Sequence, residues 1–465
     1  MKRVLGAFGL MIALTCGGAW AADRPLNTPP EGFTNLFNGK DLSGWRGRQP
    51  NFSPYLEAKF TDEERAEKQK AWNEDRDKHW HVDTAKGEIV SDGHGVHLAT
   101  EKAYGDFDMW VDWLMVSHNG DSGIYLRDYP QVQIWDPDNT REVKNGADKG
   151  SGALWNDFAG NPGKWPLVKA DNPVGQWNTF HIKMIGSRVW VWFNDKLTVD
   201  GQILDNYFDK TLKDLPPMYE HPVPVLPSGA IELQTHGSEI RFRNIYIREI
   251  KSDEANATLD KQVGEEGYKS IFNGKDFTGW GGPTDNYEVK DGAIVCKPKK
   301  GGTIHTNDEY EDFEAKLEFK LPPAGNNGLA IHYPGQGDTA YQGECELQIL
   351  DDTAKVYEHL DPRQFCCSVY GVVPAHRGYL HPVGDWNFEH VVIKGHTIRV
   401  ELNGTTVINT DVSKFNIDDP TQFMHNSKHP GLMRLKGSFG FAGHNDPVEF
   451  RAIRIKPLES APPTK

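Results

Sequence analysis

Two histidines, His236 and His444, hold corresponding places in the two halves of the chain, each directly after a run of alternating apolar residues. Such runs predict β-strands, so each histidine should lie at the end of a strand. Imidazole titrates near neutral pH, and a histidine in that position can act as a general base or acid. A hydrogen-bonded histidine that only holds a corner of the fold explains the same position equally well.

Gln131, Gln133 and Trp135 alternate along another predicted strand, so their side chains share one face of a sheet. The matching face in the second half carries Glu346 and Gln348. A retaining glycosidase needs two carboxyl groups about 5 Å apart. The two glutamines give that mechanism little support in the first half, so cleavage of a sugar bond there would need a different chemistry.

Other side chains could hold a sugar. Arg243 and Arg451 occupy corresponding places inside apolar strands, where a guanidinium group can clamp a ligand oxygen or pair with a buried acid. Flat aromatic rings suit the apolar faces of pyranose rings, although most should fill the core. The candidates near loops or strand ends include Trp135, Trp155, Trp165 and Trp177.

Two patterns are weakly typical of metal sites. The acidic residues within 136–139 are spaced loosely as in a calcium-binding loop, but the terminal glutamate of such a loop is missing. His94 and His97 stand three residues apart in a glycine-rich turn. The identity of any metal stays open: no cofactor is established, and a divalent metal ion remains a candidate.

The chain contains an internal duplication. The segment Phe37–Trp45 returns as Phe272–Trp280, and further matches follow in the same order up to 229–243 and 437–451. Repeats of this length are whole domains. We therefore predict a signal peptide at 1–22, a first domain at 23–250, a linker at 251–267, a second domain at 268–458 and a tail at 459–465.

Apolar and polar residues alternate with a period of two throughout both copies, and Gly, Asn or Pro bounds each run. Many short strands with few helices predict an all-β fold of two tandem antiparallel jelly-roll sandwiches with short helical insertions. The insertion at 49–78 of the first copy should hold a helix from Asp62 to Asp75, because Thr61 and Glu64 form a capping box. It could be a lid, but a surface decoration is favoured.

Charge and the N-terminal residues limit the classes of partner. The 465 residues include 51 Lys and Arg against 66 Asp and Glu, a net charge of −15, which argues against binding to nucleic acid or an anionic membrane. Lys2 and Arg3, followed by an apolar run and small residues, are typical of a signal peptide and not of a membrane span. We expect a periplasmic or secreted protein.

An exported protein can form disulfide bonds, and whether this one does stays an open question. The cysteines beyond the predicted signal peptide are Cys296, Cys345, Cys366 and Cys367.

Several motifs in fixed order resemble the 3-keto-disaccharide hydrolase domain family. They are FNGKDLSGW, SGIYLR, VQIWD, GQWN and the closing QTHGSEIRFRNIYIREI. The second copy is more diverged at its closing motif but keeps the family-like Glu346, where the first copy has Gln131. The resemblance implies a concanavalin A-like jelly roll in an exported protein that cleaves 3-keto-glycosides or 3-keto-disaccharides, by hydrolysis or by elimination across C1–C2.

This chemistry needs a base and oxygen-binding groups but no nucleophilic carboxylate, because a ketone at C3 acidifies the proton at C2. We therefore predict His236 as base or acid, Arg127 and Gln133 as oxygen ligands and Asp136 as an orienting or metal-binding acid. The predicted sugar-binding residues are Trp135, Trp155, Tyr125 and Arg243. In the second copy the candidates are His444, Gln348, Glu346, His332 and Arg451.

Two other interpretations stay open. The protein could be a lectin-like carbohydrate-binding protein without catalytic activity, since fold alone does not decide function. Alternatively, one copy could be catalytic while the other only binds sugar.

Overall fold

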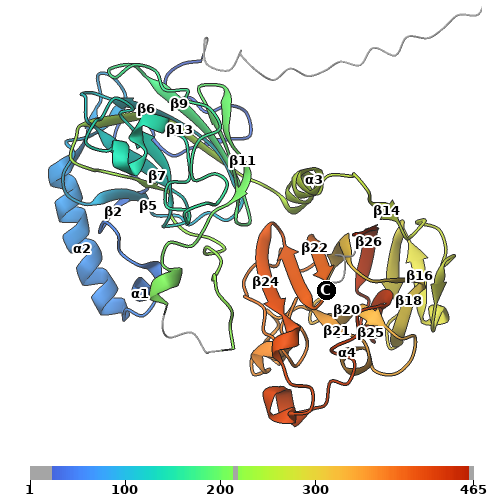
Figure 1. Ribbon diagram of the computed structural model, residues 1–465. Helices are drawn as coiled ribbons and strands as arrows, with labels where there is room; N and C mark the ends of the chain where they lie inside the picture. Colours follow the sequence, from blue (N-terminus) through green and yellow to red (C-terminus); the bar gives the residue numbers. More distant parts are fainter. Residues whose placement is uncertain (1–23, 213–217, 460–465) are drawn as a thin grey trace, which may run out of the picture.

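The computed structural model describes residues 24–212 and 218–459, and the predicted signal peptide at 1–22 lies outside them. The location in the periplasm or outside the cell stays a prediction. The described chain forms four antiparallel sheets, two in each half (Figure 1). This confirms the predicted all-β fold of two tandem jelly-roll sandwiches with short helical insertions.

In the first domain an eight-stranded sheet has the order β11-β10-β9-β6-β13-β4-β3, with β1 on β13, and a five-stranded sheet has the order β2-β5-β12-β7-β8. Their strands are β1 (Thr34–Asn35), β2 (Trp45–Arg48), β3 (Trp80–Asp83), β4 (Glu88–Ser91), β5 (His97–Thr100), β6 (Phe107–Met115), β7 (Asp121–Tyr125), β8 (Gln131–Trp135), β9 (Asn178–Ile185), β10 (Arg188–Phe193), β11 (Lys196–Ile203), β12 (Glu232–Leu233) and β13 (Ile240–Glu249).

The second domain repeats this plan, with sheets β16-β17-β26-β19-β22-β23-β24, with β14 on β26, and β15-β18-β25-β20-β21. Its strands are β14 (Lys269–Ser270), β15 (Trp280–Gly281), β16 (Tyr287–Lys290), β17 (Ala293–Cys296), β18 (Gly301–Tyr310), β19 (Phe313–Lys320), β20 (Asn326–Tyr333), β21 (Cys345–Leu350), β22 (Trp386–Lys394), β23 (Thr397–Leu402), β24 (Thr405–Asp411), β25 (Gly437–His444) and β26 (Glu449–Pro457).

The period of two explains how each sandwich is held together. Along β6, Phe107, Met109 and Val111 are fully buried between the sheets, whereas the intervening side chains face outward. The five-stranded sheet does the same with Leu98, Leu233 and their neighbours, so its other face is left for polar groups. That outward face of the small sheet carries the candidate site described below.

The insertion in the first domain forms α1 (Pro54–Glu57) and α2 (Asp62–His79). The predicted capping box between Thr61 and Glu64 is present, and the helix runs one turn beyond the predicted end. The helix is fixed against the edge strand β2: a Cβ on Gly47 would lie 2.2 Å from the carbonyl oxygen of Trp72. The insertion therefore extends the rim of the five-stranded sheet (Figure 1).

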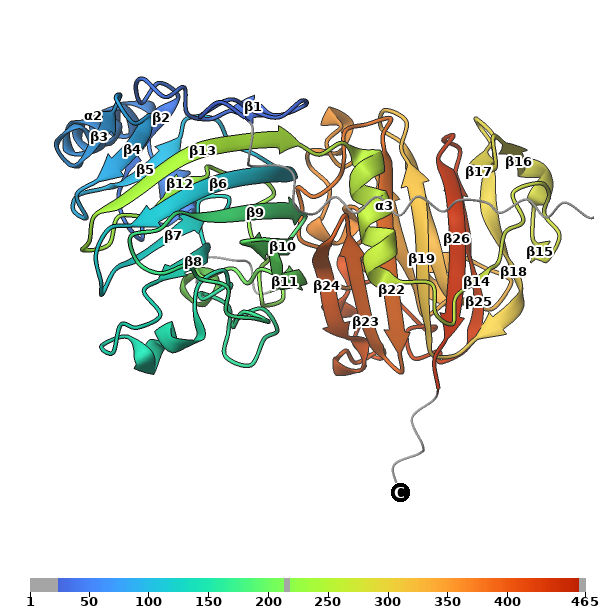
Figure 2. The same ribbon diagram turned by 90° about the horizontal axis from the view of Figure 1, so that it is seen from above.

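The segment predicted as a linker contains a helix, α3 (Ser252–Val263). Its buried residues Ala255 and Leu259 lie one turn apart and pack with Trp190 of the first domain and Phe388 of the second. Figure 2 shows α3 lying across the second domain beside β22. Two apolar side chains suffice for this contact, which is why the sequence showed no apolar rhythm there.

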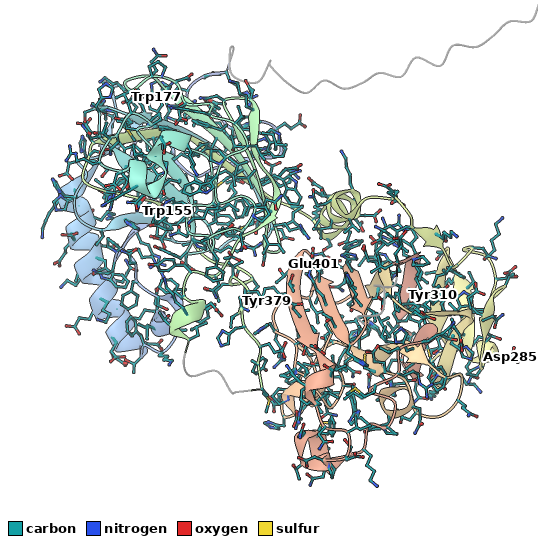
Figure 3. All side chains as sticks on the ribbon, viewed as in Figure 1. Trp155, Trp177, Asp285, Tyr310, Tyr379 and Glu401 are labelled. Atoms are coloured by element: carbon teal, nitrogen blue, oxygen red, sulfur yellow. The ribbon has the colours of Figure 1, made fainter. Side chains whose placement is uncertain are left out.

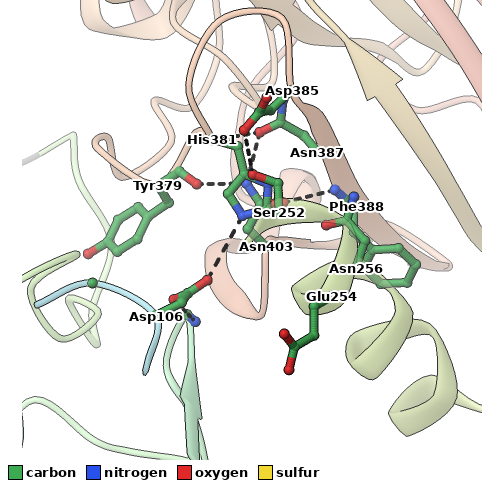
Figure 4. A network of polar contacts seen from close by, with 12 residues as sticks. Asp106, Ser252, Glu254, Asn256, Tyr379, His381, Asp385, Asn387, Phe388 and Asn403 are labelled. Carbon is green, nitrogen blue, oxygen red and sulfur yellow. Dashed lines mark hydrogen bonds and ion pairs between the residues drawn. The ribbon is translucent and has the colours of Figure 1, made fainter. Parts of the chain in front are cut away.

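Polar groups also join the domains around α3. The guanidinium of Arg188 binds Glu401 through Nε at 2.6 Å and Nη2 at 2.8 Å. Ser252 donates to Asp385 at 2.7 Å, and His381 lies 3.9 Å from Asp106 across the junction (Figure 4). The two sandwiches are therefore docked on each other as well as linked.

The four described cysteines, named above, are buried and free. Among the helices of residues 24–212 and 218–459, none has the length and apolar character that a bilayer crossing requires.

Candidate functional site

The strand register brings the predicted polar residues of the first domain onto one face. Glu232 of β12 lies opposite Tyr125 of β7, which in turn lies opposite Gln131 of β8. The next row toward the end of β8 contains Gly123 and Gln133, and the row after that contains Asp121 and Trp135. Residues on directly opposed positions share a face of the sheet, so these rows form one polar surface.

At one end of this surface His236 pairs with Asp121. The Nδ1 atom of His236 lies 2.9 Å from Asp121 Oδ2, and the histidine side chain is 61% exposed while the aspartate is 16% exposed. The hydrogen bond that His236 donates to Asp121 raises the pKa of the histidine above its ordinary value. Burial raises the pKa of Asp121 in turn. The pair thus places a titratable imidazole in contact with both solvent and a partly buried acid.

A chain of amides continues from this pair. Gln133 donates to Asp121 Oδ1 at 2.7 Å, and Gln131 donates to Gln133 Oε1 at 2.5 Å. The Gln131 side chain fits because β7 has a glycine beneath it: a Cβ on Gly123 would lie 2.0 Å from Gln131 Oε1. The sequence therefore places an amide network where a two-carboxylate glycosidase would hold acids.

Two amide oxygens of this surface are buried without a partner, those of Gln131 and Gln234. The other end of the Gln234 amide donates to the hydroxyl of Tyr125 at 3.0 Å. A buried acceptor left without a donor costs roughly 1–3 kcal/mol. Hydroxyl groups of a bound sugar would supply the missing donors.

A charged cluster lies at the opposite end of the surface, and the sequence analysis missed it. Arg48 of β2 is 2% exposed; its Nε lies 2.8 Å from Glu232 Oε1 and its Nη1 lies 3.2 Å from Asp128 Oδ1. Glu57 of α1 reaches the same guanidinium at 2.5 Å, so the insertion contributes to the cluster. Burial raises the pKa of Asp128 to about 6.

His97 of β5 connects this cluster to the middle of the surface. Its Nδ1 lies 3.3 Å from Glu232 Oε2, and its ring stacks on Tyr125 with centroids 5.1 Å apart. Burial raises the pKa of Tyr125 well above its ordinary value, so this phenol stays protonated. The alternation of Glu232 and Gln234 with His236 was the sequence signal that could have revealed Glu232.

The aromatic candidates divide between two places. Trp135 is buried opposite Asp121 and meets Trp155 edge to face, with centroids 6.2 Å apart. Trp155 is held by a hydrogen bond from its indole to the carbonyl of Asn145 at 2.9 Å. Trp177 lies elsewhere on the domain, under the guanidinium of Arg243 at 3.8 Å (Figure 3).

Three residues predicted for the first-domain site are not brought to it. Arg127 follows β7 with a φ of 50°, which turns its side chain into the interior, where it donates to Asp106 at 2.9 Å. Asp136 accepts from the backbone of Asn119 at 2.6 Å and holds a turn. Arg243 projects from the outer face of the eight-stranded sheet. We therefore leave Arg127, Asp136 and Arg243 out of the candidate site.

The second domain brings His444 and Glu346 together on the corresponding face. His444 Nε2 lies 3.4 Å from Glu346 Oε1, and this hydrogen bond raises the pKa of His444. Gln348 donates to Asn326 at 3.1 Å beside them. These groups line a pocket of about 240 Å³ together with Tyr341, Tyr357 and Tyr370.

The other two second-domain candidates lie apart from this pocket. His332 is 1% exposed, has a φ of 47° and lies 2.9 Å from buried Glu344. Arg451 pairs with Glu318 and stacks over Trp386 at 4.0 Å on the outer face of the large sheet. Both positions repeat those of Arg127 and Arg243 in the first domain.

Within residues 24–212 and 218–459, no three His, Cys, Asp or Glu side chains gather in a way that could hold a metal ion. His97 is directed at Glu232, whereas His94 packs against His79 with ring centroids 6.2 Å apart. The two histidines that the sequence spaced for a metal therefore serve different contacts.

One curated relative supports the resemblance drawn from the motifs. A curated relative from Bacteroides thetaiotaomicron, named 3-keto-disaccharide hydrolase, is 27% identical in an alignment of length 270 that covers 50% of this chain and 91% of the relative. Two solved structures of putative glycosyl hydrolases from Parabacteroides distasonis are 28% and 27% identical. They cover 41% and 43% of this chain and 99% and 98% of their own, each with a TM-score of 0.37.

The family model described as the 3-keto-alpha-glucoside-1,2-lyase-like domain matches twice, at residues 32–248 and 267–456. The two matches follow the duplication found in the sequence and together take up most of the chain. The predicted relationship is confirmed: this chain belongs to the family of 3-keto-alpha-glucoside-1,2-lyase-like domains and contains two copies of the domain.

Proposed function

We propose that the first domain cleaves the glycosidic bond of 3-keto-glycosides or 3-keto-disaccharides, with His236 as the proton-transferring group. The observation that carries the proposal is the exposed His236 imidazole held at 2.9 Å by the partly buried carboxylate of Asp121. A histidine oriented by a carboxylate is suited to general acid–base chemistry near neutral pH.

A mechanism with a carboxylate pair formed by Asp121 and Glu232 fits this surface poorly. Glu232 lies opposite Tyr125, four residues from Asp121 along β7. Four residues of strand span about 13 Å, more than either class of two-carboxylate glycosidase requires. The family relationship supplies the alternative, since a substrate with a ketone at C3 has an acidified proton at C2.

The proposed reaction begins with that proton. The imidazole of His236 takes it from C2, and the electron pair of the C–H bond forms an enolate with its charge on the C3 oxygen. The C3 carbonyl then re-forms, and the electron pair of the enolate C2–C3 double bond forms a C1–C2 double bond. The C1–O bond breaks as the leaving oxygen gains a proton. Addition of water across C1–C2 would complete net hydrolysis. Asp121 stabilises the imidazolium that forms in the first step.

The rest of the surface suits the binding of the sugar. The phenol of Tyr125 stays protonated and can donate to a developing oxyanion. The unpartnered oxygens of Gln131 and Gln234 accept from sugar hydroxyls. Trp135 and Trp155 border the end of the surface at which His236 lies.

The test is incubation of the full chain with 3-keto-trehalose or a 3-keto-glucoside in D2O, with and without a chelator, following sugar release. We expect cleavage, with deuterium at C2 of the product, while the same disaccharide without the ketone stays intact. A 2-hydroxy-enone product trapped before water adds would identify elimination. Binding without cleavage would contradict the proposal and favour a lectin-like role.

A further inference from the structure

The two domains support their strand-end histidines with carboxylates from different strands. Gly123 lies opposite Gln133, and Gly328 lies opposite Gln348, so the registers of the two small sheets correspond residue by residue. By this register Asp121 corresponds to Asn326, and Gln131 corresponds to Glu346. The acid and the amide have therefore exchanged strands between the copies.

Both arrangements deliver one carboxylate to the histidine. In the first domain Asp121 of β7 contacts His236 Nδ1 at 2.9 Å, and in the second Glu346 of β21 contacts His444 Nε2 at 3.4 Å. Glu346 takes the path of Gln131 over a glycine: a Cβ on Gly328 would lie 2.2 Å from its Oε1. The longer glutamate side chain reaches the histidine from the more distant strand.

We infer that the second domain carries a second sugar site with its own acid–base pair, in which Glu346 does for His444 what Asp121 does for His236. The reaction at this site rests on the proposed function, but the pairing and the pocket do not. The two copies hold the acid on different strands, and each contains a histidine–carboxylate pair.

The side chains around the second pair differ from those around the first in size and charge. Gly440 and Ala330 occupy the row where the first domain has Glu232 and Tyr125. The pocket itself is lined by the three tyrosines already named, with Leu360. No arginine or lysine is among the lining residues. These features suit one uncharged pyranose ring stacked against aromatic side chains.

The first test measures the pairs without relying on activity. NMR titration of the full chain follows the pKa of each histidine. Other acids also raise these pKa values: Glu142 that of His236, and Asp338 and Asp446 that of His444. We expect Glu346→Gln to lower the pKa of His444 and Asn326→Asp added to Glu346→Gln to restore it. Likewise, Asp121→Asn should lower the pKa of His236, and Gln131→Glu added to Asp121→Asn should restore it. Unchanged histidine pKa values, or no recovery in the exchanged variants, would overturn the inference.

The second test separates the two sites. Addition of a 3-keto-glucoside should shift the His444 ring signals of the His236→Ala chain, and that chain should keep part of the cleavage activity. His236→Ala with His444→Ala should keep none. If His236→Ala alone abolishes cleavage and leaves His444 unperturbed by the sugar, the second site is refuted while the proposed function stands. If the unaltered chain cleaves nothing, the proposed function fails and the titration still decides the pairing.

Discussion

The small sheet of the first domain and the small sheet of the second present the same rows with different residues. The surface of the first sheet carries a charged cluster of Arg48, Glu232, His97 and Asp128. The second sheet has Gly440 in the place of Glu232, and a pocket lined by tyrosines lies on it. Both surfaces contain a strand-end histidine with one carboxylate beside a glycine–glutamine row. In the proposed function the shared pair performs the chemistry, and the different surroundings would set the ligand of each domain.

The largest effect should come from the histidine of the shared pair. Measured in a His444→Ala background, His236→Ala should lower kcat/KM for a 3-keto-glucoside by about 100-fold or more, because general base catalysis contributes about 10²–10⁴ in rate. His359→Ala is the matched control, since His359 is 91% exposed and lies outside both surfaces. Full activity of the His236→Ala chain in this background would remove His236 from the mechanism.

The charged cluster, which only the first domain has, should matter most for stability. Arg48→Met removes the guanidinium that three buried or half-buried acids share and should lower the free energy of unfolding by about 3–5 kcal/mol in urea titration. Lys102→Met, which breaks an exposed pair with Glu249, should cost at most about 1 kcal/mol. Equal losses for the two variants would show that the cluster does not stabilise the first domain.

Loss of the carboxylate should change the pH profile as well as the rate. Asp121 raises the pKa of His236, so the free base of the unaltered domain forms only above that raised value and activity falls as the pH falls through it. Asp121→Asn should therefore move the acidic limb of kcat/KM to lower pH and reduce the maximum rate by about tenfold to 100-fold, less than loss of the general base itself.

Asp112→Asn, on the outer face of the large sheet, is the control for this change. A limb that stays in place in the Asp121→Asn chain would mean that another group sets it.

The glycine beneath the exchanged side chain should have a smaller effect. A Cβ at position 123 would displace Gln131, so Gly123→Ala should raise KM while leaving kcat close to the original value. The same change should lower the free energy of unfolding by about 1–3 kcal/mol. Gly105→Ala is the control, because the nearest atom to its added Cβ would be 3.6 Å away. A KM unaffected by Gly123→Ala would exclude Gln131 from sugar binding.

The sequence predicted what depends on local pattern. Alternation with a period of two identified the strands, and the capping box at Thr61 located the start of α2. The strand-end position of His236 and the shared face of Gln131 and Gln133 follow from the same periodicity. The repeat also showed which residues of the two copies correspond.

The remainder depends on the pairing of distant strands, which periodicity does not report. Asp121 reaches His236 only because β7 lies next to β12. Arg127 was misplaced because two successive residues with positive φ turn the chain after β7. The helix α3 was missed because its stability comes from contacts with both domains rather than from its own apolar periodicity.

The central claim is that a carboxylate-supported histidine removes the C2 proton of a 3-keto sugar. Its most direct test is the deuterium content at C2 of the sugar released from a 3-keto-glucoside in D2O, after subtraction of exchange without enzyme. The account predicts nearly complete labelling by the unaltered chain, and neither cleavage nor labelling above background by the chain with His236→Ala and His444→Ala. Rapid cleavage with protium retained at C2 would contradict it.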